Sequence, residues 1–352
     1  MSGGRDPSTL WGFTARLLLT ILLVALALFL WVVKDAVLLG FAAVLLAIAV
    51  HGVADALMKV APLPRSAALG LGALLLIAII TGILWLFGAQ LSAELSGVFD
   101  RLPSAWEQAK ETLQGNPVGA AIVSEIQHLT SGDSGGSAID MVSSAGGFAL
   151  PAASAMTTAL LVFFTAAFLT SSASVYRRGA LLLIPKGPDE KVAAALDHSA
   201  LALKKWLLGI TVDMMIITVL LAVALWALGV PAFIGLALLA GFSQFVPTVG
   251  PLIAAIPGIL LAFTLGPMTA LYTAAAYLVI SQLEANLIYP IIQKQAASIP
   301  PALNLVAILA FGMLFGPLGV LLATPILIVV TVWITKLYVQ DTLGKDAAIP
   351  GD

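Results

Sequence analysis

The stretch Phe245-Val-Pro-Thr-Val-Gly-Pro251 interrupts an almost continuous apolar region that runs from residue 231 to residue 339. A second interruption, Phe315-Gly-Pro-Leu-Gly319, follows later in that region. The apolar pieces before the breaks, 232–244 and 304–315, are too short to cross a bilayer alone, because a spanning helix needs about 20 residues. A backbone break at membrane depth is tolerated only inside protein or beside a water-filled cavity. We therefore predict two broken helices or re-entrant hairpins, which point to a transport site, with ordinary interfacial turns as the alternative.

The residues at these breaks are of the types that end helices. Proline has no amide hydrogen to continue the helix, and glycine permits tight turns and close backbone approach. We assign the two breaks to five positions: Pro247, Gly250, Pro251, Gly316 and Pro317.

The composition of the whole chain is that of a membrane protein. Hydrophobic residues make up 61% of the 352 residues and charged residues only 10%, far less charge than the surface of a soluble domain carries. The net charge of −2 gives no reason to expect a nucleic-acid partner. With no cysteine and three scattered histidines, a metal site is not expected. The motifs of ATP-binding loops, zinc peptidases and serine hydrolases are missing, so we expect neither an enzyme nor a bound cofactor.

Length and hydropathy predict further spans outside the interrupted region. Five candidates lie at residues 12–33, 36–58, 66–89, 150–172 and 206–228. The first resembles a signal peptide, but it is long enough to span and no A-x-A-like cleavage site follows it, so we expect it to be retained. The sequence thus predicts an all-α polytopic membrane protein with about eight membrane segments.

The chain accordingly divides into five parts. They are 1–89 with the N-terminal spans, 90–149 as an extracytoplasmic insertion, 150–205 with the fourth span and a basic loop, 206–339 with the broken helices, and 340–352 as a short tail. Apolar residues at helical spacing in the insertion predict two or three amphipathic helices, which lie on the membrane face or against a partner. The alternative is that they extend the third span and pack on this protein itself.

The charged loops predict the orientation. Lys and Arg concentrate in cytoplasmic loops, and both the segment 173–205 and the turn with Lys59 and Arg65 are basic. The segment 90–149 is rich in acidic residues instead. We therefore expect a multi-pass protein of a bacterial inner membrane, with both termini in the cytoplasm and 90–149 outside.

Three formally charged residues lie between 206 and 335: Asp213, Glu284 and Lys294. A carboxylate at mid-bilayer costs about 2.5–3.5 kcal/mol on insertion scales, so a carboxylate there usually has a functional role. Asp213 lies roughly 10 Å past the cytoplasmic start of its helix at 1.5 Å per residue, and Glu284 has a similar depth in a returning helix. All three could meet in the inner third of the membrane. Glu284 is then an ion or proton site with Lys294 as counter-charge. The alternative is a structural role, either in a buried pair with Lys294 or in a hydrogen-bonded clasp between helices.

Other polar residues surround Glu284 and the first break. The helix around Glu284 has two polar stripes: Tyr277, Ser281 and Glu284 in one, and Gln282, Asn286 and Tyr289 in the other. Gln244 and Thr248 flank the first break. Their side-chain oxygens, with carbonyls freed by the break, could coordinate a hard cation such as Na⁺.

The C-terminal half resembles the autoinducer-2 exporter family of bacterial membrane proteins. The resemblance is carried by Phe245-Val-Pro-Thr-Val-Gly-Pro-Leu-Ile253, Gln282-Leu-Glu-Ala-Asn-Leu-Ile-Tyr-Pro290, Pro301-Ala-Leu-Asn304 and Phe315-Gly-Pro-Leu-Gly-Val-Leu-Leu-Ala-Thr-Pro325. Order and spacing match over residues 206–335, whereas the N-terminal half fits only the layout. Ala285 departs from the polar residue expected in many members.

The resemblance implies a secondary transporter or exporter of a small solute or ion, present as a homo-oligomer. Members are assigned to export of autoinducer-2 or to Na⁺(Li⁺)/H⁺ antiport, so the family does not fix the substrate. Glu284 matches the acidic position of the family's Q-x-E-x-N pattern. Two other classes stay open, namely a passive pore built by an oligomer and a non-transporting membrane scaffold that uses its outer helices.

Overall fold

A computed structural model of the chain describes residues 32–86, 149–185, 187–247, 249–288 and 299–350, together with the single residues 20, 28, 110, 115 and 290. Within these ranges the backbone forms helices joined by turns, without a strand, which confirms the all-α prediction for the described part. The predicted first span and the predicted extracytoplasmic insertion lie almost entirely outside the described residues.

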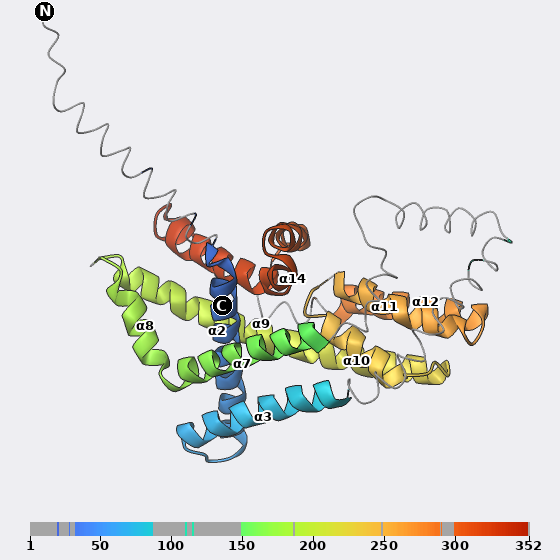
Figure 1. Cartoon of the computed structure of the whole chain (residues 1–352). Coiled ribbons are helices and arrows are strands. Elements are labelled where there is room, and N and C mark those ends of the chain that lie inside the picture. Colours follow the sequence, from blue (N-terminus) through green and yellow to red (C-terminus); the bar gives the residue numbers. More distant parts are fainter. Residues whose placement is uncertain are drawn as a thin grey trace, which may run out of the picture.

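The N-terminal helices form a unit around one central helix. Helix α2 (Lys34–Val60) carries Asp35 in its first turn and Lys59 in its last, and both charges suit the helix dipole. Helices α3 (Arg65–Leu86) and α7 (Ala149–Ser171) each pack against α2, as Figure 1 shows. Helices therefore occupy the described parts of the predicted spans 36–58, 66–89 and 150–172, and that each of them crosses the membrane stays a prediction.

The basic segment 173–205 is mostly helical. Helix α8 (Ala173–Leu182) turns by 86° from the end of α7, and α9 (Asp189–Ala227) then runs for 39 residues. A helix of this length measures about 58 Å, well beyond the roughly 30 Å of hydrocarbon core. The charged first part of α9 therefore continues the apolar part without a break, which the prediction of a loop followed by a span did not include.

The first predicted break is the tip of a helical hairpin. Helix α10 (Phe233–Ser243) ends there and α11 (Val249–Phe263) begins. A Cβ atom added to Gly250 would lie 1.7 Å from the carbonyl oxygen of Ser243, so the two arms approach closely at the tip. A Cβ on Gly241 would lie 1.9 Å from Oγ1 of Thr218. The backbone of α10 at this glycine therefore lies directly against α9.

The second predicted break also folds the chain back. Helix α14 (Pro301–Trp333) contains Gly316 at φ 66° and ψ −150°, a backbone conformation that favours glycine. Across this point a Cβ on Gly319 would lie 2.1 Å from the carbonyl oxygen of Phe311. Further along, Oγ1 of Thr324 donates a hydrogen bond of 3.0 Å to Oδ1 of Asn304. By length and hydropathy alone Pro301–Gln340 could be one span, but these contacts show that its two arms lie against each other.

The remaining helices complete the C-terminal region. Helix α12 (Pro267–Leu283) follows the first hairpin and passes into a short π-helix, η3 (Glu284–Ile288). A second π-helix, η4 (Ile334–Gln340), follows α14. Buried side chains form two apolar clusters, one joining α2, α9 and α14 and the other joining α9, α10, α11 and α12.

Among the described residues, three helices are long and apolar enough to cross a membrane, or four if α7 and α8 form one bent span. Many large apolar side chains on these helices are exposed, such as Met313 at 89% and Trp226 at 66%. Apolar surface of this extent suits a lipid environment. The several apolar helices support a membrane protein, and the count of about eight segments stays a prediction.

Ion pairs place the basic segments at one end of the molecule. Lys204 of α9 pairs with Asp55 near the end of α2, and Lys191 approaches Asp341 behind η4 at 3.9 Å. The end of α2, the first part of α9 and the C-terminal segment are therefore neighbours. The predicted topology requires all three on the same side of the membrane, and their assignment to the cytoplasm stays a prediction.

Candidate functional site

The tip of the first hairpin touches the end of α12. Gln244 follows the last turn of α10, and its Nε2 donates a 2.6 Å hydrogen bond to Oε2 of Glu284. Gln244 is only 1% exposed, whereas Glu284 is half-buried and lines a cavity, so the contact is closed to solvent on the Gln244 side. Hydrogen bonds to an ionised partner are stronger than neutral ones, and a buried donor with no acceptor would cost about 1–3 kcal/mol. The predicted candidates Gln244 and Glu284 are thus direct partners.

Asp213 joins this pair from α9. Its side chain is 3% exposed, and the carboxyl group is close enough to Glu284 for the two charges to interact. Among the described residues, Oδ1 of Asp213 and Oε1 of Gln244 have no hydrogen-bond partner. Two acidic groups, one buried and one half-buried, therefore gather with a buried amide oxygen at one place. Burying such a cluster of acidic and polar groups costs free energy unless a proton, a cation or a bound solute compensates the negative charge.

A cavity of about 530 Å³ opens beside Glu284. Its polar wall comes from α12 and η3 and includes Ser281, Gln282 and Glu284. Pro247 and Pro251 line it from the first hairpin. The two halves of the predicted site, the polar stripe and the Pro/Gly break, therefore face the same space, whose volume lies in the range of small-molecule sites.

Tyr277 fixes the distance between α11 and α12 at this cavity. A Cβ on Gly258 would lie 2.6 Å from the Tyr277 hydroxyl, so the tyrosine ring covers the glycine backbone. The hydroxyl is buried and has no hydrogen-bond partner among the described residues. Tyr277 thus adds a further buried polar atom to the cavity wall.

Not every predicted candidate joins the site. The Nδ2 atom of Asn286 donates to its own helix, to the carbonyl oxygen of Gln282 at 2.8 Å and to Oε1 of Gln282 at 3.2 Å. Gly316 and Pro317 form the turn of the other hairpin instead. Thr248 and Lys294 lie outside the described residues, so the proposed Glu284–Lys294 pair stays a prediction.

The site includes one polar pair that we did not predict. Asn304 lines the cavity from the start of α14 and accepts the hydrogen bond from Thr324, and both side chains are buried. Both residues stand in motifs that carry the family resemblance, Pro301-Ala-Leu-Asn304 and Ala-Thr-Pro325. The two motifs could therefore have marked Asn304 and Thr324 as candidates. Their pairing depends on the fold of the second hairpin, which the spacing along the sequence does not reveal.

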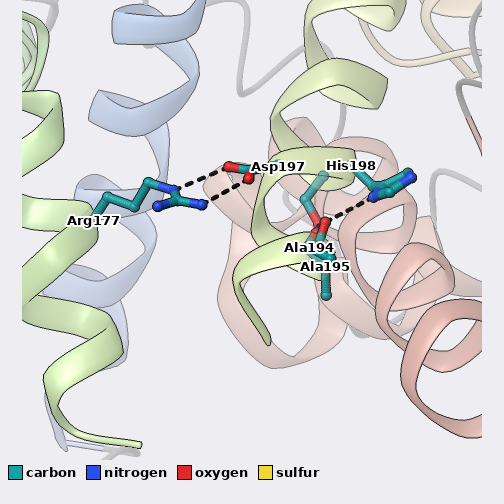
Figure 2. A network of polar contacts seen from close by, with 6 residues as sticks. Arg177, Ala194, Ala195, Asp197 and His198 are labelled. Carbon is teal, nitrogen blue, oxygen red and sulfur yellow. Dashed lines mark hydrogen bonds and ion pairs between the residues drawn. The ribbon is translucent and has the colours of Figure 1, made fainter. Parts of the chain in front are cut away.

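A separate polar cluster lies at the basic end of the molecule (Figure 2). Nε and Nη2 of Arg177 donate to the two carboxylate oxygens of Asp197 at 3.0 and 2.7 Å, which ties α8 to α9. Nδ1 of His198 lies 2.7 Å from the carbonyl oxygen of Ala194 in its own helix. Because Arg177 and Asp197 are largely exposed, this pair contributes at most about 1 kcal/mol and serves as a structural tie.

The arrangement defines a class of protein. Folded-back helices, a buried and a half-buried acidic group, and a cavity with a polar wall in an apolar helical protein are the features of membrane transporters, whose sites lie where helices are interrupted. Comparison with known proteins agrees with this class. The model of a family described as AI-2E family transporter matches residues 19–338, and the chain belongs to this family.

Three relatives illustrate the similarity. YrrI of Bacillus subtilis is 26% identical over 171 residues, which are 49% of this chain and 47% of that protein. MT0215 of Mycobacterium tuberculosis is 37% identical over 99 residues, or 28% of this chain and 27% of that protein. The AI-2 transport protein TqsA of Escherichia coli is 32% identical over 109 residues, or 30% of each chain. The matched stretches thus span about half or less of these relatives.

Proposed function

We propose that this protein is a secondary transporter in which Asp213, Gln244 and Glu284 form the coupling site. The observation that carries the proposal is the part-buried hydrogen bond between Gln244 and Glu284, with Asp213 within electrostatic range. It joins the tip of a hairpin to the point where α12 becomes a π-helix, and π-helical turns occur frequently at functional sites.

The coupling follows from competition for the same negative charge. A proton or a monovalent cation can each neutralise Glu284 and Asp213, but the buried space favours only a limited net charge. Binding of one therefore releases the other. The unpaired oxygens of Asp213 and Gln244 are suitable ligands for a hard cation. The driving ion is a proton or a monovalent cation, and membership in a transporter family favours this role over that of an enzyme.

The transported solute belongs to the same proposal. The family resemblance and the relative TqsA, named as an AI-2 transport protein, support export of a small autoinducer-2-like signal, and Na⁺(Li⁺)/H⁺ antiport is the second candidate. We place the protein in a bacterial inner membrane as a homo-oligomer with both termini in the cytoplasm. The basic turn and the basic segment 173–205 support that orientation.

Reconstituted protein distinguishes coupled transport from a passive pore. Proteoliposomes with a pH-sensitive dye inside receive an outward Na⁺ or Li⁺ gradient without any proton gradient. A secondary antiporter moves protons against their own equilibrium, so the dye reports an internal pH change that collapses with an ionophore. A passive pore would only relax gradients that already exist, and a scaffold would give the trace of empty liposomes. Either of those results would refute coupled ion exchange.

A further inference from the structure

A second cavity lies far from the coupling site along the chain, between α3 and α7. It has a volume of about 360 Å³ and is lined almost entirely by apolar side chains. Leu46 and Val50 of α2 form its floor, Leu69 and Ala73 belong to α3, and Phe163 belongs to α7. Both α3 and α7 pack on α2, and Figure 1 shows each of them crossing it. The cavity is therefore a cleft between two helices over a third.

One end of this cleft is polar. Ser66 of the first turn of α3 lines it, together with Thr170 and Ser171 at the end of α7. Oγ1 of Thr170 is buried and has no hydrogen-bond partner among the described residues. An unpaired buried hydroxyl costs free energy, so it points to a polar group that is bound there.

The same end carries positive charge. Arg65 is the first residue of α3, and Lys59 lies in the last turn of α2 just before the connecting turn. Both side chains are exposed, and neither forms an ion pair with a described residue. The free amide groups at the start of α3 add further positive potential. A phosphate group would satisfy these charges and the Thr170 hydroxyl.

The rest of the cleft needs an apolar occupant. Water is disfavoured against such a wall at membrane depth, and an empty cleft would forfeit packing contacts. A second copy of this chain is the alternative occupant, but an apolar helix would leave the buried Thr170 hydroxyl without a partner. A flexible hydrocarbon chain has the required width. Its length also suits the cleft, because the 12 residues from Ser66 to Ile77 extend about 17 Å along α3.

We propose that the cleft between α2, α3 and α7 binds one acyl chain of an anionic phospholipid, whose phosphate lies between Arg65 and the hydroxyl of Thr170. This inference does not depend on the coupling site, since no residue of the cleft lines the cavity beside Glu284.

Two glycines of α3 allow a matched test. Gly70 lines the cleft, whereas Gly82 does not, and a Cβ on either would meet no atom within 4 Å. Gly70→Phe therefore fills the cleft without a backbone clash, and Gly82→Phe adds the same ring elsewhere on the same helix. The full-length protein is purified in mild detergent, and native mass spectrometry measures retention of added phosphatidylglycerol or phosphatidylcholine with identical acyl chains.

We expect the wild type and Gly82→Phe to retain one phosphatidylglycerol, and Gly70→Phe to bind it at least tenfold more weakly. Arg65→Gln should reduce the preference for phosphatidylglycerol over phosphatidylcholine about fivefold, since one cation at a membrane surface is worth about 1 kcal/mol. Equal retention by the two phenylalanine variants would overturn the site. Loss of subunits from Gly70→Phe without loss of lipid would overturn it as well, because the cleft would then be an interface between copies. Equal binding of both lipids to the wild type would refute the phosphate assignment.

Discussion

At the scale of single residues, the buried polar atoms near Glu284 are the most informative feature. Gln244 donates to Glu284, but Oε1 of Gln244 and Oδ1 of Asp213 remain without a described partner. In a purely structural polar contact, each buried polar atom would normally have a hydrogen-bond partner, because a buried network with unpaired atoms is less stable than an apolar core. The unpaired oxygens therefore favour a site that binds something over a purely structural pair.

Gly250 gives a prediction at this scale. Its backbone touches the Ser243 carbonyl at the hairpin tip, so Gly250→Ala must push the two arms apart. Overpacking of this kind costs about 1–3 kcal/mol, which should lower the Tm of the detergent-solubilised protein by several degrees. Gly40→Ala in α2 is the control, because a Cβ there meets no atom within 4 Å. An unchanged Tm in Gly250→Ala would show that the arms do not meet at this glycine.

At the scale of elements, the two hairpins were predictable from Pro and Gly positions in the apolar region. The breaks at 245–251 and 315–319 mark both folds, and Gly316 has the positive φ that such a turn requires. What each hairpin touches could not be predicted, because spacing along the chain does not define tertiary neighbours. The contact between Asn304 and Thr324 and the continuous helix from Asp189 into the span were missed for this reason.

Thr324 tests whether the second hairpin is closed as described. Thr324→Val keeps the shape of the side chain but leaves Oδ1 of the buried Asn304 without its donor, at a cost of about 1–3 kcal/mol. Thr324→Ser keeps the hydroxyl and should restore most of that stability. Thermal unfolding in detergent measures both variants. If valine and serine gave the same Tm as threonine, the hydrogen bond between the two arms would not form.

At the scale of the whole molecule, the apolar exterior and the family match agree on a membrane transporter. The composition already predicted this class, since 10% charged residues cannot cover a water-exposed surface of this size. The pairing of Lys204 with Asp55 and of Lys191 with Asp341 adds that the basic segments and the C-terminal segment share one end. Sequence alone suggested this only through the distribution of charge.

The orientation of that end can be measured with single cysteines, because the chain has none. In intact cells, a cysteine at Ser134 should react with an impermeant thiol reagent and one at Ser174 should be protected. The reason is that basic segments stay in the cytoplasm, and Ser174 lies beside Arg177 and Arg178. Permeabilised cells serve as the control, in which both positions should react. The opposite pattern in intact cells would reverse the topology.

The central claim is that Glu284 couples transport to an ion. In proteoliposomes, Glu284→Gln retains the size of the side chain and can still bond to Gln244, but it cannot exchange a proton for a cation. We predict that its Na⁺-driven proton movement falls to the level of empty liposomes, while its oligomeric state and Tm match the wild type. Glu190→Gln, in the first turn of α9 away from the cavity, should transport normally. Wild-type coupled flux in Glu284→Gln would contradict the account.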